Sequence, residues 1–220
     1  MNAAGHLSTA TDDLLRSRGR FAPGVPVEVR SLIALLVVSS AAYGLVLGAF
    51  GLRPLQMLYS AIKVPLLLGA TTLICLPSFF AIHGVLGLRE QFGEAVRGVL
   101  ASQATFGIAL ASLAPLTALV YVSSDEYPIA TLQNGLMFAL ATAAAHVTMT
   151  RHYERLVARD RRHRLTRIAW VLIYVFVAIQ MAWVMRPFVG DPSTPTAFFR
   201  ARAWSNAYVE VLHAIALAFR

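Results

Sequence analysis

Residues 64–88 read VPLLLGATTLICLPSFFAIHGVLGL and contain no Asp, Glu, Lys or Arg. About 20 apolar residues in a helix are enough to cross the hydrocarbon core of a bilayer. A stretch of this length without charge is typical of a transmembrane helix, because a charged side chain is costly to place in hydrocarbon. This stretch therefore predicts an α-helical protein embedded in a membrane.

Four further stretches share this apolar character, and none of them carries a charged residue. Together they predict an all-α fold, a polytopic transmembrane helix bundle of five spans with an amphipathic helix at the C-terminus. The five predicted spans are residues 31–50, 64–88, 98–122, 129–149 and 168–185. We expect a cytosolic N-terminal segment over 1–30, the five-span bundle over 31–188, and an extracytosolic cap with the tail helix over 189–220.

The composition supports a membrane protein and excludes several other classes. Apolar residues make up 57% of the 220 residues and charged residues only 14%, whereas soluble domains carry about 25% charged residues. The mean hydropathy is +0.63. Cys75 is the single cysteine, which excludes an intrachain disulfide and a thiolate metal cluster. All of the 19 basic residues except Lys63 are arginine, a bias that points to a GC-rich bacterial genome.

The distribution of basic residues predicts the orientation of the chain. With the N-terminus in the cytosol, most of the 19 Arg and Lys residues lie in cytosolic segments, as the positive-inside rule requires. The loop SSDEYP, residues 123–128, is then acidic and outside. The long polar segment before residue 31 favours a retained signal-anchor over a cleaved signal peptide. We therefore expect a multi-pass protein of the bacterial inner membrane with a cytosolic N-terminus.

The segment after the fifth span combines prolines, arginines and aromatic residues, which is typical of an ordered element at the membrane interface. We expect Asp191 to pair with Arg186 or with Lys63 in this outer cap, which would be a surface for extracytosolic contacts. The cap residues are Arg186, Asp191, Phe198, Phe199 and Trp204.

The chain after the cap allows two interpretations. Leu212, Ile215 and Phe219 recur on one helical face, which predicts an amphipathic helix at the interface. The alternative is a sixth span over 197–219, which would have to bury Arg200 and Arg202.

The densest cluster of charge lies between the fourth and fifth spans, and its arginines are Arg151, Arg155, Arg159, Arg161, Arg162 and Arg164. One interpretation is a docking surface for anionic lipid headgroups or an acidic partner. The other is an anchor that only fixes topology. The cluster lacks a folded reading element and interleaved aromatic residues, so we do not expect it to bind nucleic acid.

Three polar residues inside the spans share a depth. His83, Gln103 and His146 each lie five residues from the cytosolic end of a span, roughly 7–8 Å inside the boundary at 1.5 Å per residue. If the spans are neighbours, these side chains form a candidate proton relay or ligand site. The alternative is three unrelated groups near the interface.

Prolines and small residues predict the shape of two spans. Residues 53–63 are expected along the outer interface, with Pro65 starting the crossing helix and Pro77 kinking it. A broken helix is where transporters bind substrate, whereas a simple kink has no such role. On the first span, Ser40, Gly44 and Gly48 recur every fourth residue, a spacing that favours close helix packing.

Catalytic motifs are missing from the sequence. It contains no H-E-x-x-H, G-x-S-x-G, Walker loop or C-x-x-C. The one E-x-x-H, at Glu210 and His213, falls short of the two pairs that a di-iron bundle needs. We therefore expect a protein that is not an enzyme and that carries neither a cofactor nor a metal.

The layout resembles that of Yip-type membrane proteins, which have a cytosolic N-terminal segment followed by five closely spaced spans. The resemblance covers residues 31–188 and rests on the short loops and on the stretches AAYGLVLGAFG (41–51) and SAIKVPLLLGATTLICLPSFF (60–80). It implies a non-enzymatic membrane scaffold; eukaryotic members act in vesicle trafficking and contact small GTPases. The chain from Arg186 onward departs from that pattern.

Two hypotheses about function follow from the sequence. The first is a scaffold or docking component for other membrane proteins or for lipids, with a membrane-protein partner or a second copy of the chain beside it. The alternative is a small transporter or permease subunit with its site around the kinked second span and His83, Gln103 and His146.

Overall fold

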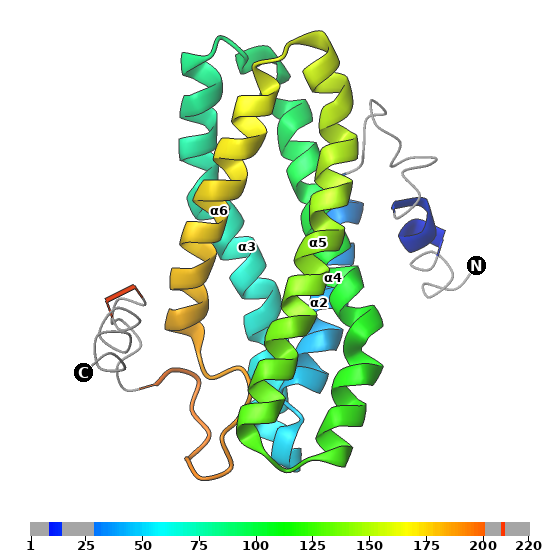
Figure 1. Ribbon diagram of the computed structural model, residues 1–220, viewed down its shortest axis with the longest axis vertical. Coiled ribbons are helices and arrows are strands. Elements are labelled where there is room, and N and C mark those ends of the chain that lie inside the picture. Colours follow the sequence, from blue (N-terminus) through cyan, green and yellow to red (C-terminus); the bar gives the residue numbers. More distant parts are fainter. Residues whose placement is uncertain (1–8, 15–28, 201–207, 210–220) are drawn as a thin grey trace.

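The computed structural model describes residues 9–14, 29–200 and 208–209, and five long helices dominate these ranges (Figure 1). No strand occurs in this part of the chain, so the predicted all-α class is confirmed. The long helices are α2 (Val29–Leu47), α3 (Pro54–Val85), α4 (Phe92–Ser123), α5 (Tyr127–Arg159) and α6 (His163–Met185). Two 3-10 turns, η2 (Phe50–Leu52) and η3 (Arg89–Gln91), precede α3 and α4.

Four of these helices, α2, α3, α4 and α6, are long and apolar enough to cross a membrane. Helix α5 is not among them, since Gln133, Asn134 and His146 interrupt its apolar residues. Large apolar side chains also face outward; Leu73 is 68% exposed and Phe176 is 61% exposed. Soluble proteins rarely expose wide apolar surfaces, so these helices are compatible with a protein embedded in a membrane.

Consecutive long helices run in opposite directions, which gives the bundle two distinct ends (Figure 1). The α3–α4 and α5–α6 connections lie at one end, here called the arginine-rich end after residues 151–164. The α2–α3 and α4–α5 connections lie at the other, the cap end, together with residues 186–200. Helix α5 has 33 residues and is about 50 Å long at 1.5 Å per residue, so it exceeds a hydrocarbon core of about 30 Å.

Helix α2 lies between α3 and α4 and touches the backbone of both. A Cβ atom placed on Gly44 would lie 2.8 Å from the Cα of Ala61 on α3, and one on Gly48 would lie 2.7 Å from the Cα of Met57. On the α4 side, a Cβ on Gly107 would come within 3.2 Å of the Leu36 carbonyl oxygen. Ser40 is buried nearby, and its hydroxyl donates to the Leu36 carbonyl oxygen. At Gly44 and Gly48, a side chain larger than hydrogen would require the α3 backbone to move.

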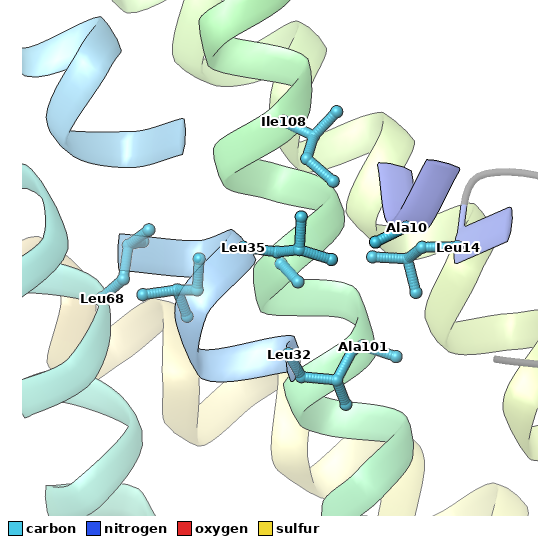
Figure 2. Packing of buried hydrophobic residues seen from close by; sticks show 9 residues of the cluster. Ala10, Leu14, Leu32, Leu35, Leu68, Ala101 and Ile108 are labelled. Carbon is cyan, nitrogen blue, oxygen red and sulfur yellow. The ribbon is translucent and has the colours of Figure 1, made fainter. Parts of the chain in front are cut away.

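A short helix at residues 9–14 also belongs to the packed core. Figure 2 shows Ala10 and Leu14 beside Leu35, Ala101 and Ile108 from α2 and α4. Leu14 is 0% exposed. This part of the predicted cytosolic segment therefore packs against the bundle, because its apolar side chains find a partner surface there. The other residues before 29 lie outside the described ranges.

Helix α3 is continuous through both Pro65 and Pro77. The prediction that Pro65 starts the crossing helix is therefore wrong, because residues 54–63 already belong to α3. Pro54 stands in the first turn instead, where its missing N–H costs nothing. The polar side chains of the turns after it bind the segment that follows α6, as described below.

Candidate functional site

The three polar residues predicted to share a depth do not all meet. Gln103 and His146 line one groove, whereas His83 faces the start of α6. The His83 ring centroid lies 5.9 Å from that of His163, and its Nδ1 is 2.9 Å from the Phe79 carbonyl oxygen. His83 is fully buried against Phe79 and Phe92. The spans carrying the three residues are not mutual neighbours, since α3 packs mainly on α2 and α6.

The groove that holds Gln103 and His146 runs between α5 and α6 and has a volume of about 710 Å³. Residues of α3 and α4 form its floor, and α3 is visible between α5 and α6 in Figure 1. Its lining is predominantly apolar. A volume within roughly 300–1,000 Å³ is usual for small-molecule sites, so the groove is large enough to hold a ligand.

The groove exists because α5 and α6, although consecutive, pack on different partners. Helix α5 packs along α4 and helix α6 packs along α3, while contacts between α5 and α6 are sparse. Several facing residues are small, which leaves space between the two helices: Gly135 and Ala145 on α5, Ala178 and Ala182 on α6. The result is an opening on the side of the bundle rather than at its end.

A hydrogen bond crosses the floor of the groove. The Tyr174 hydroxyl on α6 donates to Gln103 Oε1 on α4 over 3.0 Å. Gln103 was a candidate from the sequence, but its partner was not. A tyrosine seven residues after Arg167, in an otherwise apolar span, was the available signal, and only the tertiary structure shows that the two side chains meet.

A polar cluster near the cap end satisfies Asn134, another groove residue that sequence reasoning missed. Its Oδ1 accepts a hydrogen bond from the Tyr43 hydroxyl at 2.8 Å, and its Nδ2 donates to the Tyr121 hydroxyl at 2.6 Å. Tyr121 in turn donates to the Leu47 carbonyl oxygen. Buried polar groups are normally paired in this way. The cluster therefore ties α2, α4 and α5 together.

Residues 186–200 are held against the first turns of α3. Gln56 Nε2 donates to the Phe188 carbonyl oxygen at 2.9 Å, and Lys63 Nζ donates to that of Pro187 at 2.7 Å. Arg53 donates to the carbonyl oxygens of Asp191 and Thr194, both at 2.9 Å. Three side chains of α3 and its N-terminal flank thus bind backbone that has no helix partner, which satisfies these carbonyl groups.

The predicted pairing of Asp191 with Arg186 or Lys63 is wrong. Its carboxylate accepts hydrogen bonds from the Ser193 hydroxyl at 2.7 Å and the Ser193 N–H at 2.9 Å. These bonds, with smaller contributions from nearby arginines, hold the pKa of Asp191 below its ordinary value. Lys63 is occupied by the Pro187 carbonyl, because the turn places backbone oxygens rather than a carboxylate over it.

Aromatic residues of the cap also contact α3, and one lies beyond the described chain. The Phe198 ring packs edge-on against Tyr59 with centroids 5.2 Å apart, and Phe199 packs against Phe198 at 4.8 Å. The Lys63 ammonium lies 4.8 Å from the Phe198 ring centroid. Trp204, the remaining cap candidate, and the predicted tail helix fall outside the described residues, apart from 208–209.

Two arginines line the groove at its cap end. The Arg186 guanidinium stacks on the Trp183 ring, with its Cζ 3.2 Å from the ring centroid. Arg200 Nη2 lies 3.5 Å from the Tyr127 hydroxyl, across from α6. A positive, hydrogen-bonding end therefore closes a predominantly apolar groove, an arrangement that suits an amphiphile with an anionic head.

The six arginines of the arginine-rich end are all exposed. Arg159 pairs with Glu94 on α4 at 2.8 Å. Arg162 Nη1 donates to the Leu86 carbonyl oxygen at 3.2 Å, near the end of α3. Arg151, Arg155, Arg161 and Arg164 complete this surface. Within the described ranges, no group of three or more His, Cys, Asp or Glu side chains is placed to hold a metal ion.

The comparison of the chain with known proteins gives no relative from which a function can be transferred. No known protein family matches the sequence, and no curated protein or solved structure is similar enough to count as a match.

Proposed function

We propose that this chain is a non-enzymatic docking protein of the bacterial inner membrane that holds lipid in the groove between α5 and α6. The observation that carries the proposal is the groove itself, about 710 Å³ in volume and largely apolar. In a bundle embedded in the membrane, a groove that opens on the side between α5 and the apolar helix α6 faces the bilayer. Its natural occupant is therefore a molecule that already resides in hydrocarbon.

The dimensions of the groove support this occupant. Its α6 side extends from Trp170 to Arg186, which corresponds to about 24 Å of helix at 1.5 Å per residue. The hydrocarbon core of a bilayer is about 30 Å thick. An apolar chain that lies along α6 can thus stay within the hydrocarbon over its whole length.

The same proposal includes five spans with the N-terminus in the cytosol. Helix α5 is then the fourth span. Its polar residues form hydrogen bonds or face the groove, so they are not surrounded by lipid. The arginine-rich end lies in the cytosol, in agreement with the positive-inside rule. The layout of a Yip-type scaffold fits this arrangement, with a membrane-protein partner or a second copy of the chain as a further contact.

The alternative of a small transporter has less support. Its site was predicted around a kinked second span, and α3 has no break in the helix at Pro77. It also needed His83 near Gln103 and His146, and His83 packs elsewhere. Substrate- or proton-dependent flux through liposomes that contain the purified chain would nevertheless favour the transporter over docking.

The proposal is tested by filling the groove. Ala178 lines it, whereas Ala118 on α4 is exposed and does not. The Ala178→Trp variant should lose most of the lipid that remains bound after detergent extraction, measured by native mass spectrometry. Ala118→Trp adds the same side chain outside the groove and should retain lipid as the wild type does. Equal retention by all three proteins would rule out the groove as the lipid site.

A further inference from the structure

We infer that the groove selects an anionic glycerophospholipid, whose phosphate lies at Arg186 and Arg200 and whose acyl chain runs along α6 toward Trp170. This inference rests on the proposed function and adds the chemical class of the lipid and its direction. The groove has one charged end and a long apolar remainder, which is the polarity of a phospholipid.

The charge at the cap end carries the first step. Arg186 and Arg200 reach the groove from two sides, Arg186 after the end of α6 and Arg200 beside Tyr127 of α5. Guanidinium groups bind phosphate through paired hydrogen bonds. Asp125 and Glu126 in the α4–α5 connection and Asp191 in the cap lie at the same end, and Asp191 interacts with Arg200, but none of the three lines the groove. The end of the groove is therefore positive.

The geometry of the two arginines carries the second step. Stacking on Trp183 fixes the plane of the Arg186 guanidinium and orders it before any ligand arrives. Arg200 is exposed and bonds weakly to Tyr127 at 3.5 Å. A phosphate oxygen at this place would give Arg200 a stronger, charge-assisted partner.

The inside of the groove carries the third step. Three polar side chains of the groove are already bonded, since Tyr174 bonds to Gln103 and Asn134 bonds to Tyr43 and Tyr121. His146 also lines the groove and is exposed. What remains toward the middle is chiefly aliphatic and aromatic surface, from Leu67, Phe138 and Ile179 among others. Such a surface accepts hydrocarbon and has little to offer a second headgroup.

A second hollow in the structure differs from the groove because it has no charged end. It lies between α3 and α6 near the arginine-rich end, and the residues that line it, such as Ile82, Leu165 and Leu172, are all apolar. Without a charged end it has no feature that distinguishes one lipid from another. Of the two hollows, only the groove, through its cap end, should therefore show a headgroup preference.

The test is a competition between two lipids with identical acyl chains. The purified full chain is mixed with equal amounts of phosphatidylglycerol and phosphatidylcholine, and native mass spectrometry gives the ratio of the bound lipids. We expect phosphatidylglycerol to predominate, and Arg200→Gln to reduce its excess about fivefold, the effect of one basic residue near an anionic headgroup. The total amount of bound lipid should stay the same, because the acyl chain still fills the groove.

Matched variants distinguish this site from general attraction to positive charge. Arg155→Gln removes an exposed arginine at the opposite end and should leave the ratio unchanged. Arg186→Gln should act like Arg200→Gln, and Arg186→Lys should retain more of the preference. Loss of the preference in Arg155→Gln but not in Arg200→Gln would overturn the inference, and so would a wild type without preference.

The outcomes also separate this inference from the proposed function. If Ala178→Trp removes lipid but wild-type protein binds both lipids equally, docking stands and headgroup selection fails. If Ala178→Trp removes none, the groove is not the lipid site and both fail. Inorganic phosphate should not displace phosphatidylglycerol, and displacement would show a site for free phosphate instead.

Discussion

Helices α2 and α6 are both apolar and both long enough to cross a membrane, yet they pack in opposite ways. Helix α2 touches the backbone of α3 through Gly44 and Gly48. Helix α6 is kept away from α5 and meets α4 through a tyrosine side chain. In the most apolar stretch of each helix, 33% of the residues are buried in α2 and 17% in α6. Hydrophobicity alone therefore does not decide how closely a helix packs.

The difference follows from the residues at each crossing. Without a hydrophobic force between helices in lipid, association depends on van der Waals contact, hydrogen bonds and the closeness of the backbones. Glycine allows backbone contact on α2. On α6, the bulky Trp170 and Tyr174 fill the interface toward the arginine-rich end, and the small Ala178 and Ala182 beyond them leave the groove open. A closed contact and an open site result from the same physical rule.

The largest effect is expected from breaking the closed contact. Gly44→Leu would force its Cβ against the α3 backbone at Ala61, so we expect a loss of about 3 kcal/mol in the free energy of unfolding, the upper range for overpacking. Reversible unfolding in mixed detergent–SDS micelles, followed by circular dichroism, measures it. The control is Gly69→Leu on α3, where an added Cβ meets nothing within 4 Å. A Gly44 variant as stable as the Gly69 variant would contradict backbone contact.

A smaller effect is expected where the cap closes one end of the groove. Gln56→Leu removes the donor to the Phe188 carbonyl oxygen and leaves the backbone at 187–188 with fewer partners. Ser60 and Lys63 still donate to these two carbonyl oxygens, so we expect a loss of about 1 kcal/mol, the net contribution of a typical hydrogen bond. The same unfolding measurement applies, and limited proteolysis should cut residues 190–200 sooner than in the wild type. Unchanged proteolysis would show that the cap does not depend on α3.

The smallest effect is expected on the open side. Tyr174→Phe removes one hydrogen bond between α6 and α4, and bonds between transmembrane helices contribute about 0.6 kcal/mol on average. Tyr59→Phe is the control, since the Tyr59 hydroxyl has no hydrogen-bond partner among the described residues and its ring still packs on Phe198. A Tyr174 effect as large as that of Gly44→Leu would mean that α6 is held by this bond and not by its packing on α3.

Much of the fold was predictable because it depends on local composition. Long apolar runs specified helices, and the structure contains a helix over each predicted span. The boundary before α3 was predicted wrongly, since Pro65 resembles a helix start when its neighbours in space are unknown. The burial of Leu14 was also not visible in the sequence, because a short polar segment gives no sign of the surface it will meet.

The candidate site was predictable only in part, for a different reason. Depth along a helix follows from residue number, so Gln103 and His146 could be placed at one level. Rotation about the helix axis and the choice of neighbour cannot be counted in this way. His83 lies at the same depth but faces His163. Asp191 was expected to pair with Arg186 or Lys63, but its carboxylate bonds to Ser193.

The sequence by itself determined that this chain is helical, strongly apolar and asymmetric in charge, because length, hydropathy and arginine positions are properties of the chain alone. The tertiary structure decided which helices touch and which stand apart. This packing leaves the groove between α5 and α6 and places Arg186 and Arg200 at one end of it. The physical reason is that a groove depends on how two helix surfaces are placed relative to each other. It forms between α5 and α6 because each of them packs mainly on another helix.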